Sequence, residues 1–365
     1  MNAPKLRFKE FNDNYLRLKY KDVLKIKSGK DQKQVECENG IYPILGTGGQ
    51  IGKTNSFLYD KPSVLIGRKG TINKPQYMET PFWTVDTLFY SHIYEPNIPK
   101  YLFYSFQNVN WKKYDESTGV PSLSSSTIEG VDCHIPSKEE QLKVANFLSL
   151  LDKKIELQSR KIEDLKLFKK GLINSIGKNI EIEKIPLKNI LAEQNHKTIK
   201  NNEYEILSST SKGIYLQKDY FNKQAASDNN VGYKILKKNQ LVLSPQNLWM
   251  GNININSKYN IGIVSPSYKI FDINNNIDID FFDYWIKSPK ALYEYKISSE
   301  QGASIVRRNL NMDLFYEIKV DIPKGKMQNK LGKIIKLLNL KIQYNENSLQ
   351  KLQELKKGLM QNMFV

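Results

Sequence analysis

The chain has 365 residues, a net charge of +17 and enough hydrophobic residues, at 40%, to bury more than one core. A single core rarely grows beyond about 250–300 residues, so we expect two domains with connecting elements. Two cysteines exclude a disulfide-stapled secreted fold, and no window approaches about 18 uninterrupted apolar residues, so no membrane partner is expected and the protein is predicted to be cytoplasmic.

The positive charge favours a polyanionic partner, because lysine and arginine release counterions when they contact phosphates. The largest local excess is at 324–365, with nine lysines against two glutamates. A basic composition that only keeps the surface solvated is the alternative. Charge therefore favours nucleic acid without identifying a surface.

The first region, 1–136, is rich in Tyr, Phe, Thr, Ile and Gly and contains short apolar runs such as Ser63–Gly67, which predict a mixed α/β domain. Gly46–Thr54 (GTGGQIGKT) is close to a phosphate-binding loop, but Thr47 stands where that loop needs glycine. A glycine-rich turn between strands, with backbone near a DNA phosphate, is the better interpretation. A nucleotide-hydrolysing enzyme is the weaker alternative, which ATP binding at this loop would support.

An internal repeat organises the rest of the chain. Residues 135–177 align without a gap with 322–364, at an offset of 187. Ile135-Pro136 matches Ile322-Pro323, and Lys169–Leu172 (KKGL) matches Lys356–Leu359 (KKGL). Chance can produce two amphipathic helices, but it rarely repeats the same start and end at the same spacing.

Each copy is predicted to be one long helix, at 137–177 and 324–365. Ser137 and Glu140 fit a capping box at the first helix start. A narrow apolar stripe with 3-4 spacing recurs in both copies, interrupted by polar residues at equivalent positions (Gln158 and Asn345, Lys169 and Lys356). Such a stripe is typical of a two-stranded coiled coil, so we expect the helices to pack on each other.

A second mixed α/β region, 178–323, lies between the two helices. The chain thus reads as domain 1–136, helix 137–177, domain 178–323 and helix 324–365. The three histidines have no metal-ligand spacing, so no metal site is predicted. No methyltransferase or nuclease motif stands out, and no catalytic residue is proposed.

This plan resembles the DNA-specificity subunit of a type I restriction–modification system. The resemblance is carried by Tyr42–Gly49 (YPILGTGG), Val64–Pro75 (VLIGRKGTINKP), Thr118–Ile128 (TGVPSLSSSTI) and Gly302–Ile322 (GASIVRRNLNMDLFYEIKVDI), and it is weaker at 192–300. It implies an α+β fold: two target-recognition domains separated by two long antiparallel helices in a coiled coil, with pseudo-twofold symmetry. Each domain would read half of a bipartite sequence in double-stranded DNA.

The resemblance also implies partners. Two methylation subunits would bind the helices and use S-adenosylmethionine to methylate adenine N6, and up to two restriction/motor subunits would bring ATP and Mg. This chain would bind no cofactor and catalyse nothing. The main alternative is a coiled-coil assembly scaffold without sequence-specific DNA recognition, which DNA footprinting with the methylation partner would separate.

Candidate DNA contacts are polar or basic residues on expected loops, because base reading requires donors and acceptors on a rigid scaffold. Arg68 is the candidate guanine reader, and Gln246 and Asn247 are candidate adenine readers. The full set is Thr47, Gly48, Gly49, Lys53, Thr54, Arg68, Lys69, Lys74, Lys112, Lys113, Ser122 and Ser124 in the first domain, with Ser209, Lys212, Gln246, Asn247, Arg307 and Arg308 in the second. Helix capping by Ser126 is an equally good role for the serine run. Trp249 is assigned to the core.

Partner-binding residues should be apolar side chains on the long helices, outside the seam between them. We expect Phe147, Leu157, Leu340 and Tyr344 to serve this role. Two near-equivalent faces suit two copies of one partner.

Overall fold

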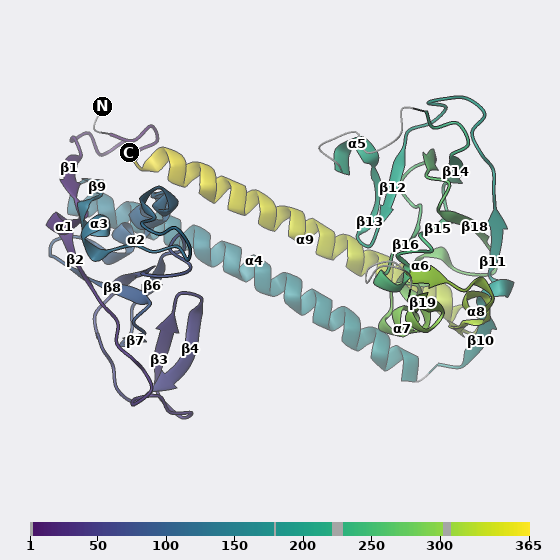
Figure 1. The fold of residues 1–365 in the computed structure, drawn as a ribbon, viewed down its shortest axis with the longest axis horizontal. Helices are drawn as coiled ribbons and strands as arrows, with labels where there is room; N and C mark the ends of the chain where they lie inside the picture. The colour runs from purple at the N-terminus through teal and green to yellow at the C-terminus, as the bar shows by residue number, and fades with distance from the viewer. Residues whose placement is uncertain (1–2, 179, 221–228, 302–307) are drawn as a thin grey trace. The chain divides into compact units, whose positions relative to one another are not determined.

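The computed structural model describes residues 3–178, 180–220, 229–301 and 308–365. The chain forms two compact units, which we call the N-terminal unit (Met1–Lys161 with Glu346–Val365) and the central unit (Ile162–Asn345). Two long helices, α4 (Lys138–Lys178) and α9 (Met327–Met363), each contribute one part to each unit (Figure 1). The predicted mixed α+β composition and the two long helices are confirmed.

The N-terminal unit is built around a four-stranded antiparallel sheet in the order β2-β8-β5-β6 and a smaller sheet in the order β4-β3-β7. Its elements are β1 (Leu16–Lys19), α1 (Tyr20–Val23), β2 (Leu24–Lys27), β3 (Tyr42–Gly46), β4 (Gly49–Thr54), β5 (Ser63–Gly67), β6 (Gln76–Met78), β7 (Trp83–Thr84), β8 (Leu88–Ile93), α2 (Pro99–Asn108), η1 (Trp111–Tyr114), α3 (Ser125–Gly130) and β9 (Asp132–Ile135). Every residue of β5 is buried, as expected for a short apolar run in the centre of a sheet.

The glycine-rich segment Gly46–Thr54 lies in the β3–β4 hairpin, where the two strands pair antiparallel. The next element along the chain is the strand β5, whereas a phosphate-binding loop leads into a helix. The predicted turn between strands is confirmed, and the nucleotide-hydrolysing alternative loses the feature on which it depended.

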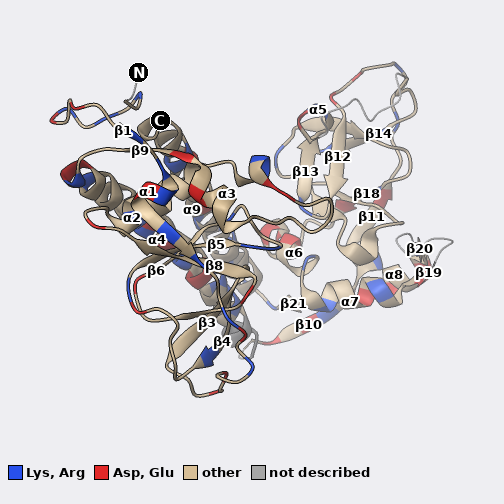
Figure 2. Cartoon of the chain, turned by 60° about the vertical axis from the view of Figure 1, so that its left-hand side comes forward, with Lys and Arg blue, Asp and Glu red and all other residues tan. Residues whose placement is uncertain are grey.

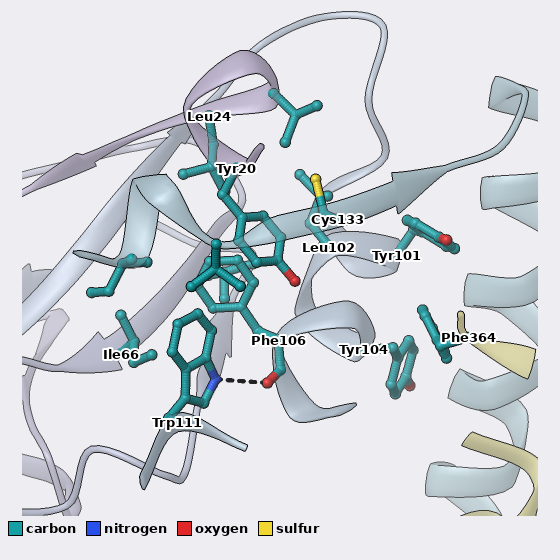
Figure 3. Close-up of a cluster of buried hydrophobic side chains, with 14 of the residues drawn as sticks. Tyr20, Leu24, Ile66, Tyr101, Leu102, Tyr104, Phe106, Trp111, Cys133 and Phe364 are labelled. Carbon is teal, nitrogen blue, oxygen red and sulfur yellow. Dashed lines mark hydrogen bonds between the residues drawn. The ribbon is translucent and has the colours of Figure 1, made fainter. Parts of the chain in front are cut away.

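Aromatic side chains from α1, α2 and η1 fill the core of this unit (Figure 3). Tyr20, Phe106 and Trp111 lie against one another, and the Trp111 indole N–H donates to the Phe106 carbonyl (2.8 Å). Phe364, which follows α9, packs on Tyr101. Burial raises the pKa of the Cys133 thiol to about 12, which is typical of a structural cysteine.

The segment before β1 is fixed to the start of α4 by a buried ion pair. Arg7 donates from Nε and Nη2 to the two carboxylate oxygens of Glu140 (2.8 and 2.7 Å), and the Tyr15 hydroxyl donates to the same carboxylate (2.9 Å). The predicted capping box is therefore half correct. The Glu140 N–H donates to the Ser137 hydroxyl (3.3 Å), but the Glu140 carboxylate binds Arg7 and Tyr15 instead of closing the box.

The central unit also has a four-stranded antiparallel sheet, in the order β11-β18-β15-β16. Its elements are β10 (Ile182–Pro186), η2 (Leu187–Asn189), β11 (Leu191–Gln194), β12 (Leu207–Thr210), β13 (Gly213–Leu216), α5 (Gln217–Tyr220), β14 (Lys234–Lys237), β15 (Leu241–Leu243), η3 (Leu248–Met250), β16 (Ile253–Ile255), β17 (Ile261–Val264), β18 (Lys269–Ile273), α6 (Ile279–Trp285), α7 (Pro289–Ile297), β19 (Ser299–Gln301), β20 (Arg308–Leu310), α8 (Met312–Glu317) and β21 (Lys319–Pro323). Phe271, Phe282 and Phe315 are central to its main core.

Predicted seam positions are buried on both long helices. On α4, Leu148 and Ile162 are buried, and on α9, Ile335 and Ile342 are buried. The two helices also touch within each unit. Lys356 pairs with Asp152 in the N-terminal unit (2.6 Å), and Lys169 donates to Asn339 in the central unit (2.6 Å).

Candidate nucleic-acid interface

Two loops of the N-terminal unit are held together by main-chain bonds at one end of β5. The Gly70 N–H donates to the Pro121 carbonyl (2.8 Å), and the Leu123 N–H donates to the Arg68 carbonyl (2.9 Å). Lys69 and Ser122 form an isolated β-bridge. The exposed side chains of Arg68 and Lys69 therefore start from a backbone that is fixed on both sides.

The turn of the β3–β4 hairpin belongs to the same group of loops. The Gln76 side-chain amide, on β6, donates to the Gly46 carbonyl (2.9 Å) and approaches the Thr47 carbonyl (3.4 Å). Gly70 has a φ of +87°, and a Cβ placed there would lie 3.8 Å from the Thr47 hydroxyl. The structure thus brings the predicted Thr47 turn beside the Arg68 loop.

Most candidates in this unit reach the surface. Gly48, Lys53, Arg68, Lys69, Lys74, Lys112 and Lys113 are exposed, and Thr47 and Gly49 are half-buried. Thr54 is a correction: it is fully buried, and its hydroxyl accepts the Ser56 N–H (3.0 Å). Its place at the inner end of β4, rather than in the turn, excludes it from DNA contact in this arrangement.

One serine of the run caps a helix, but it is not the serine that the sequence analysis named. Ser124, not Ser126, is the N-cap of α3, where its hydroxyl accepts the Thr127 N–H (3.1 Å). Ser124 also bonds the Glu116 carboxylate (2.9 Å), so little of its bonding capacity is left for phosphate. Ser122 is half-buried, and its N–H donates to Asp115 (2.9 Å).

Two carboxylates accompany these serines. The hydrogen bond from the Ser122 N–H, with those from Ser117, lowers the pKa of Asp115. The hydrogen bond from the Thr127 hydroxyl lowers the pKa of Glu116. Both groups stay ionised at neutral pH and repel phosphate, so contacts to the DNA backbone near this loop would depend on Lys112 and Lys113.

The central unit repeats the loop arrangement with different side chains. The loop after β15 contains Gln246, whose carbonyl accepts the Arg308 N–H (3.2 Å). The Arg308 guanidinium lies 5.0 Å from the centre of the Trp249 ring, and its Nη1 donates to the Ser299 carbonyl (3.3 Å). Arg308, predicted to hold phosphate, is half-buried in these contacts, and Arg307 lies outside the described residues.

Gln246 is exposed and Asn247 is half-buried on this loop, and Lys212 is exposed at the β12–β13 turn. Trp249 is half-buried beside Arg308, rather than in the core to which the sequence assigned it. A side chain that is held in the loop by a cation–π contact supports the loop's shape.

Ser209 is a second correction, because it is buried and fully engaged. Its hydroxyl donates to Asn252 Oδ1 (2.8 Å) and accepts from Asn254 Nδ2 (2.8 Å). The Asn254 amide also donates to the Thr210 carbonyl (2.8 Å), so it holds the β12–β13 turn as Gln76 holds the β3–β4 turn. These inward asparagines were not among the predicted site residues, although the Asn–Ile alternation at 252–256 is a sequence signal for them.

Basic and acidic residues are interleaved along the ribbon of each unit (Figure 2). Within the described residues, no group of three or more His, Cys, Asp or Glu side chains is arranged to hold a metal ion. No helix in that part of the chain is long and apolar enough to cross a membrane. What the loops offer is hydrogen-bond donors, amides and positive charge on fixed backbone, which suits polyanion binding and base reading.

The predicted partner-binding residues lie on the long helices. All four of them, Phe147, Leu157, Leu340 and Tyr344, are exposed, and the ring of Phe8 meets that of Phe147 edge-on. At repeat-equivalent positions, α4 exposes Phe147, Leu150, Leu157 and Phe168, and α9 exposes Ile334, Leu337, Tyr344 and Leu355. Each set lies along one face of its helix, so each helix carries a second apolar stripe. Leu340 is exposed too and lies three residues after Leu337 and four before Tyr344, so it belongs to the stripe of α9.

Comparisons with known proteins agree on one group. Residues 12–167 match the family model described as the Type I restriction modification DNA specificity domain. The crystal structure of a type I restriction–modification S subunit from M. genitalium aligns over 100% of this chain and 99% of its own, with a TM-score of 0.70 and 19% identity. A structure from a study of complex assembly of the type I R-M system aligns over 95% and 96%, with a TM-score of 0.50 and 8% identity. At these identities the two structures show a shared fold.

Proposed function

We propose, from the match of residues 12–167 to the family model described as the Type I restriction modification DNA specificity domain, that this chain reads a bipartite DNA sequence within a cytoplasmic methylation complex. The chain itself performs no chemistry. It selects the site and places partner subunits on it. Those partners bind S-adenosylmethionine for adenine methylation and, where restriction occurs, ATP and Mg.

The observation that carries this proposal is the pair of matching loop arrangements. In each unit a loop follows a central strand, β5 or β15, and one of its carbonyl oxygens accepts a main-chain N–H from another segment, at Leu123 or at Arg308, the first residue of β20. The scaffold is the same, but Arg68 stands on one loop and Gln246 on the other. Guanidinium and amide groups suit guanine and adenine respectively, so two such loops on one chain are suited to two different half-sites.

The contacts of the long helices support an internal repeat with pseudo-twofold symmetry. Lys356 bonds Asp152, and Lys169 bonds Asn339, and these pairs are equivalent at the offset of 187. Each lysine also lies over a tyrosine ring, Tyr104 on α2 or Tyr284 on α6.

The direction of packing supports an antiparallel coiled coil. In the N-terminal unit, Leu148 precedes Asp152 on α4, and it shares a core with Met360 and Met363, which follow Lys356 on α9. Two rigid helices of this kind would keep two readers at a set distance along the DNA.

The second apolar stripe on each helix would bind the methylation subunits. Leu150 and Leu337, at equivalent positions, are 69% and 66% exposed, so replacing either by aspartate should change the free energy of unfolding by less than about 0.5 kcal/mol. Each single variant is expected to retain one partner copy and the double variant none, as measured by the mass of the complex in sedimentation. Glu163→Ser, on the opposite face of α4, is the control. Full partner occupancy in the double variant would show that this stripe does not bind the methylation subunits.

Mapping of methylated adenines tests the function directly. When the chain is expressed with its methylation partners in a host lacking other adenine methylation, we expect one bipartite motif with a fixed gap. Footprinting of the same complex should protect both half-sites. A complex that assembles but neither methylates nor protects a defined sequence would instead support the assembly scaffold.

A further inference from the structure

Each long helix carries a glutamine in its first turn and a small residue four positions later. Gln141 and Ala145 stand on α4, and Gln328 and Gly332 stand at the equivalent positions on α9. The two glutamines match at the repeat offset of 187. Their contacts show what they do.

In the N-terminal unit, Gln141 completes the start of another helix. Helix α2 begins with Pro99, and its N-cap, Ile98, has no side-chain cap. The Ile98 N–H donates to Gln141 Oε1 (2.9 Å), and Gln141 Nε2 donates to the Pro136 carbonyl (3.1 Å). Gln141 is buried, so the Ile98 N–H and the amide satisfy each other away from water.

In the central unit, Gln328 does the same for α6. The N–H of Asp278, the N-cap of α6, donates to Gln328 Oε1 (3.1 Å), and Gln328 Nε2 donates to the Asn276 carbonyl (2.8 Å). Gly332 allows the close approach, because a Cβ there would lie 2.0 Å from Asp278 Oδ1.

A helix normally completes its own capping box with a side chain from its first turn. Here the side chain comes from a different helix, so the bond holds only if the two helices keep one relative placement. Helix α2 carries Tyr101 and Phe106 into the N-terminal core, and α6 carries Phe282 and Trp285 into the central core. Each glutamine thus fixes a domain core to the first turn of a long helix.

We propose that Gln141 and Gln328 are positioning residues that set which gap between half-sites the complex accepts. The proposal rests on the proposed function, because it concerns the distance between two DNA readers. A shift at the start of either helix would be carried to the loops of that domain. Loss of the bond should therefore widen the range of gap lengths that the complex accepts, without changing the bases that are read.

The test uses the complex with its methylation partners and measures methylation at sites whose gap is one base pair longer or shorter than the preferred one. Gln141→Met and Gln328→Met keep the side-chain length but remove the hydrogen bonds. We expect the ratio of altered-gap to preferred-gap methylation to rise about tenfold in each, because a buried N–H loses its acceptor. Gln328→Glu keeps the acceptor for the Asp278 N–H but loses the donor to the Asn276 carbonyl, so its ratio should lie between those of Gln328→Met and the unsubstituted chain. Asn329→Ala, an exposed neighbour, is the matched control.

A uniform fall in methylation at every gap, with an unchanged ratio, would overturn the inference, because it would mean that the glutamines only stabilise the fold. An unchanged ratio at full activity would overturn it too. Gln328 is half-buried, so the Gln328 variants decide the question if Gln141→Met fails to fold. If the unsubstituted complex methylates no bipartite site, the proposed function fails and the inference fails with it.

Discussion

Replacing Arg68 by alanine is expected to relax base preference at one position of one half-site and to leave the other half-site unchanged. Arg68 is exposed on a loop that is bonded to Leu123 through its own carbonyl, so its loss removes a side chain without freeing the loop. A bidentate contact between arginine and guanine discriminates by about 1–3 kcal/mol, which corresponds to a fall of roughly 5- to 150-fold in methylation of the original site. The methylated motif, mapped genome-wide, provides the measurement.

Two further substitutions make this result specific. Gln246→Ala should relax the half-site that Arg68→Ala leaves intact, because Gln246 occupies the matching loop of the central unit. Lys69→Ala, beside Arg68, should weaken binding at all sequences alike, as expected for a phosphate contact. If the Arg68→Ala complex reads the same bases with the same efficiency, Arg68 is not a base reader.

Replacing Arg7 by alanine is expected to destabilise the protein strongly, because its partner Glu140 is buried. The Arg7 and Glu140 side chains are 14% and 1% exposed, whereas those of the Arg17–Asp132 pair are 67% and 43% exposed. Without Arg7, the Glu140 carboxylate remains buried without its cation, which costs about 3–5 kcal/mol in comparable cases. Arg17→Ala, the matched control, should cost far less than Arg7→Ala because water already screens its pair.

Urea denaturation followed by circular dichroism measures both free energies of unfolding. Adding Glu140→Gln to Arg7→Ala should recover part of the loss, since a neutral amide can still accept from Tyr15. Equal effects of Arg7→Ala and Arg17→Ala would show that the buried pair does not hold the N-terminal segment on α4.

The sequence predicted elements best where a long periodic pattern was available. The stripe through Leu148, Ile162, Ile335 and Ile342 is buried as its spacing required, because helical period and burial are directly linked. The Gly46–Thr54 turn was recognisable for a similar reason, since one non-glycine position excluded the phosphate loop. Repetition of both helices at one offset added information that no single segment carries.

Individual contacts in the candidate site were harder to predict. Thr54 and Ser209 looked like surface donors, but burial depends on which strand end they occupy and on what packs above them. Ser124 rather than Ser126 caps α3, a difference of two residues that periodicity does not resolve. The bonds of Gln141 and Gln328 join residues 43 and 50 positions apart, so no local sequence pattern predicts them.

The amides that hold the two hairpin turns bind carbonyl oxygens of the main chain. Gln76 reaches the carbonyl of Gly46, and Asn254 reaches that of Thr210. Every amino acid supplies that oxygen, so the anchor survives when the turn's side chains are exchanged. New residues can therefore be tried at the tips of both hairpins while the scaffold stays in place, which gives such a chain a route to new target sequences through few mutations.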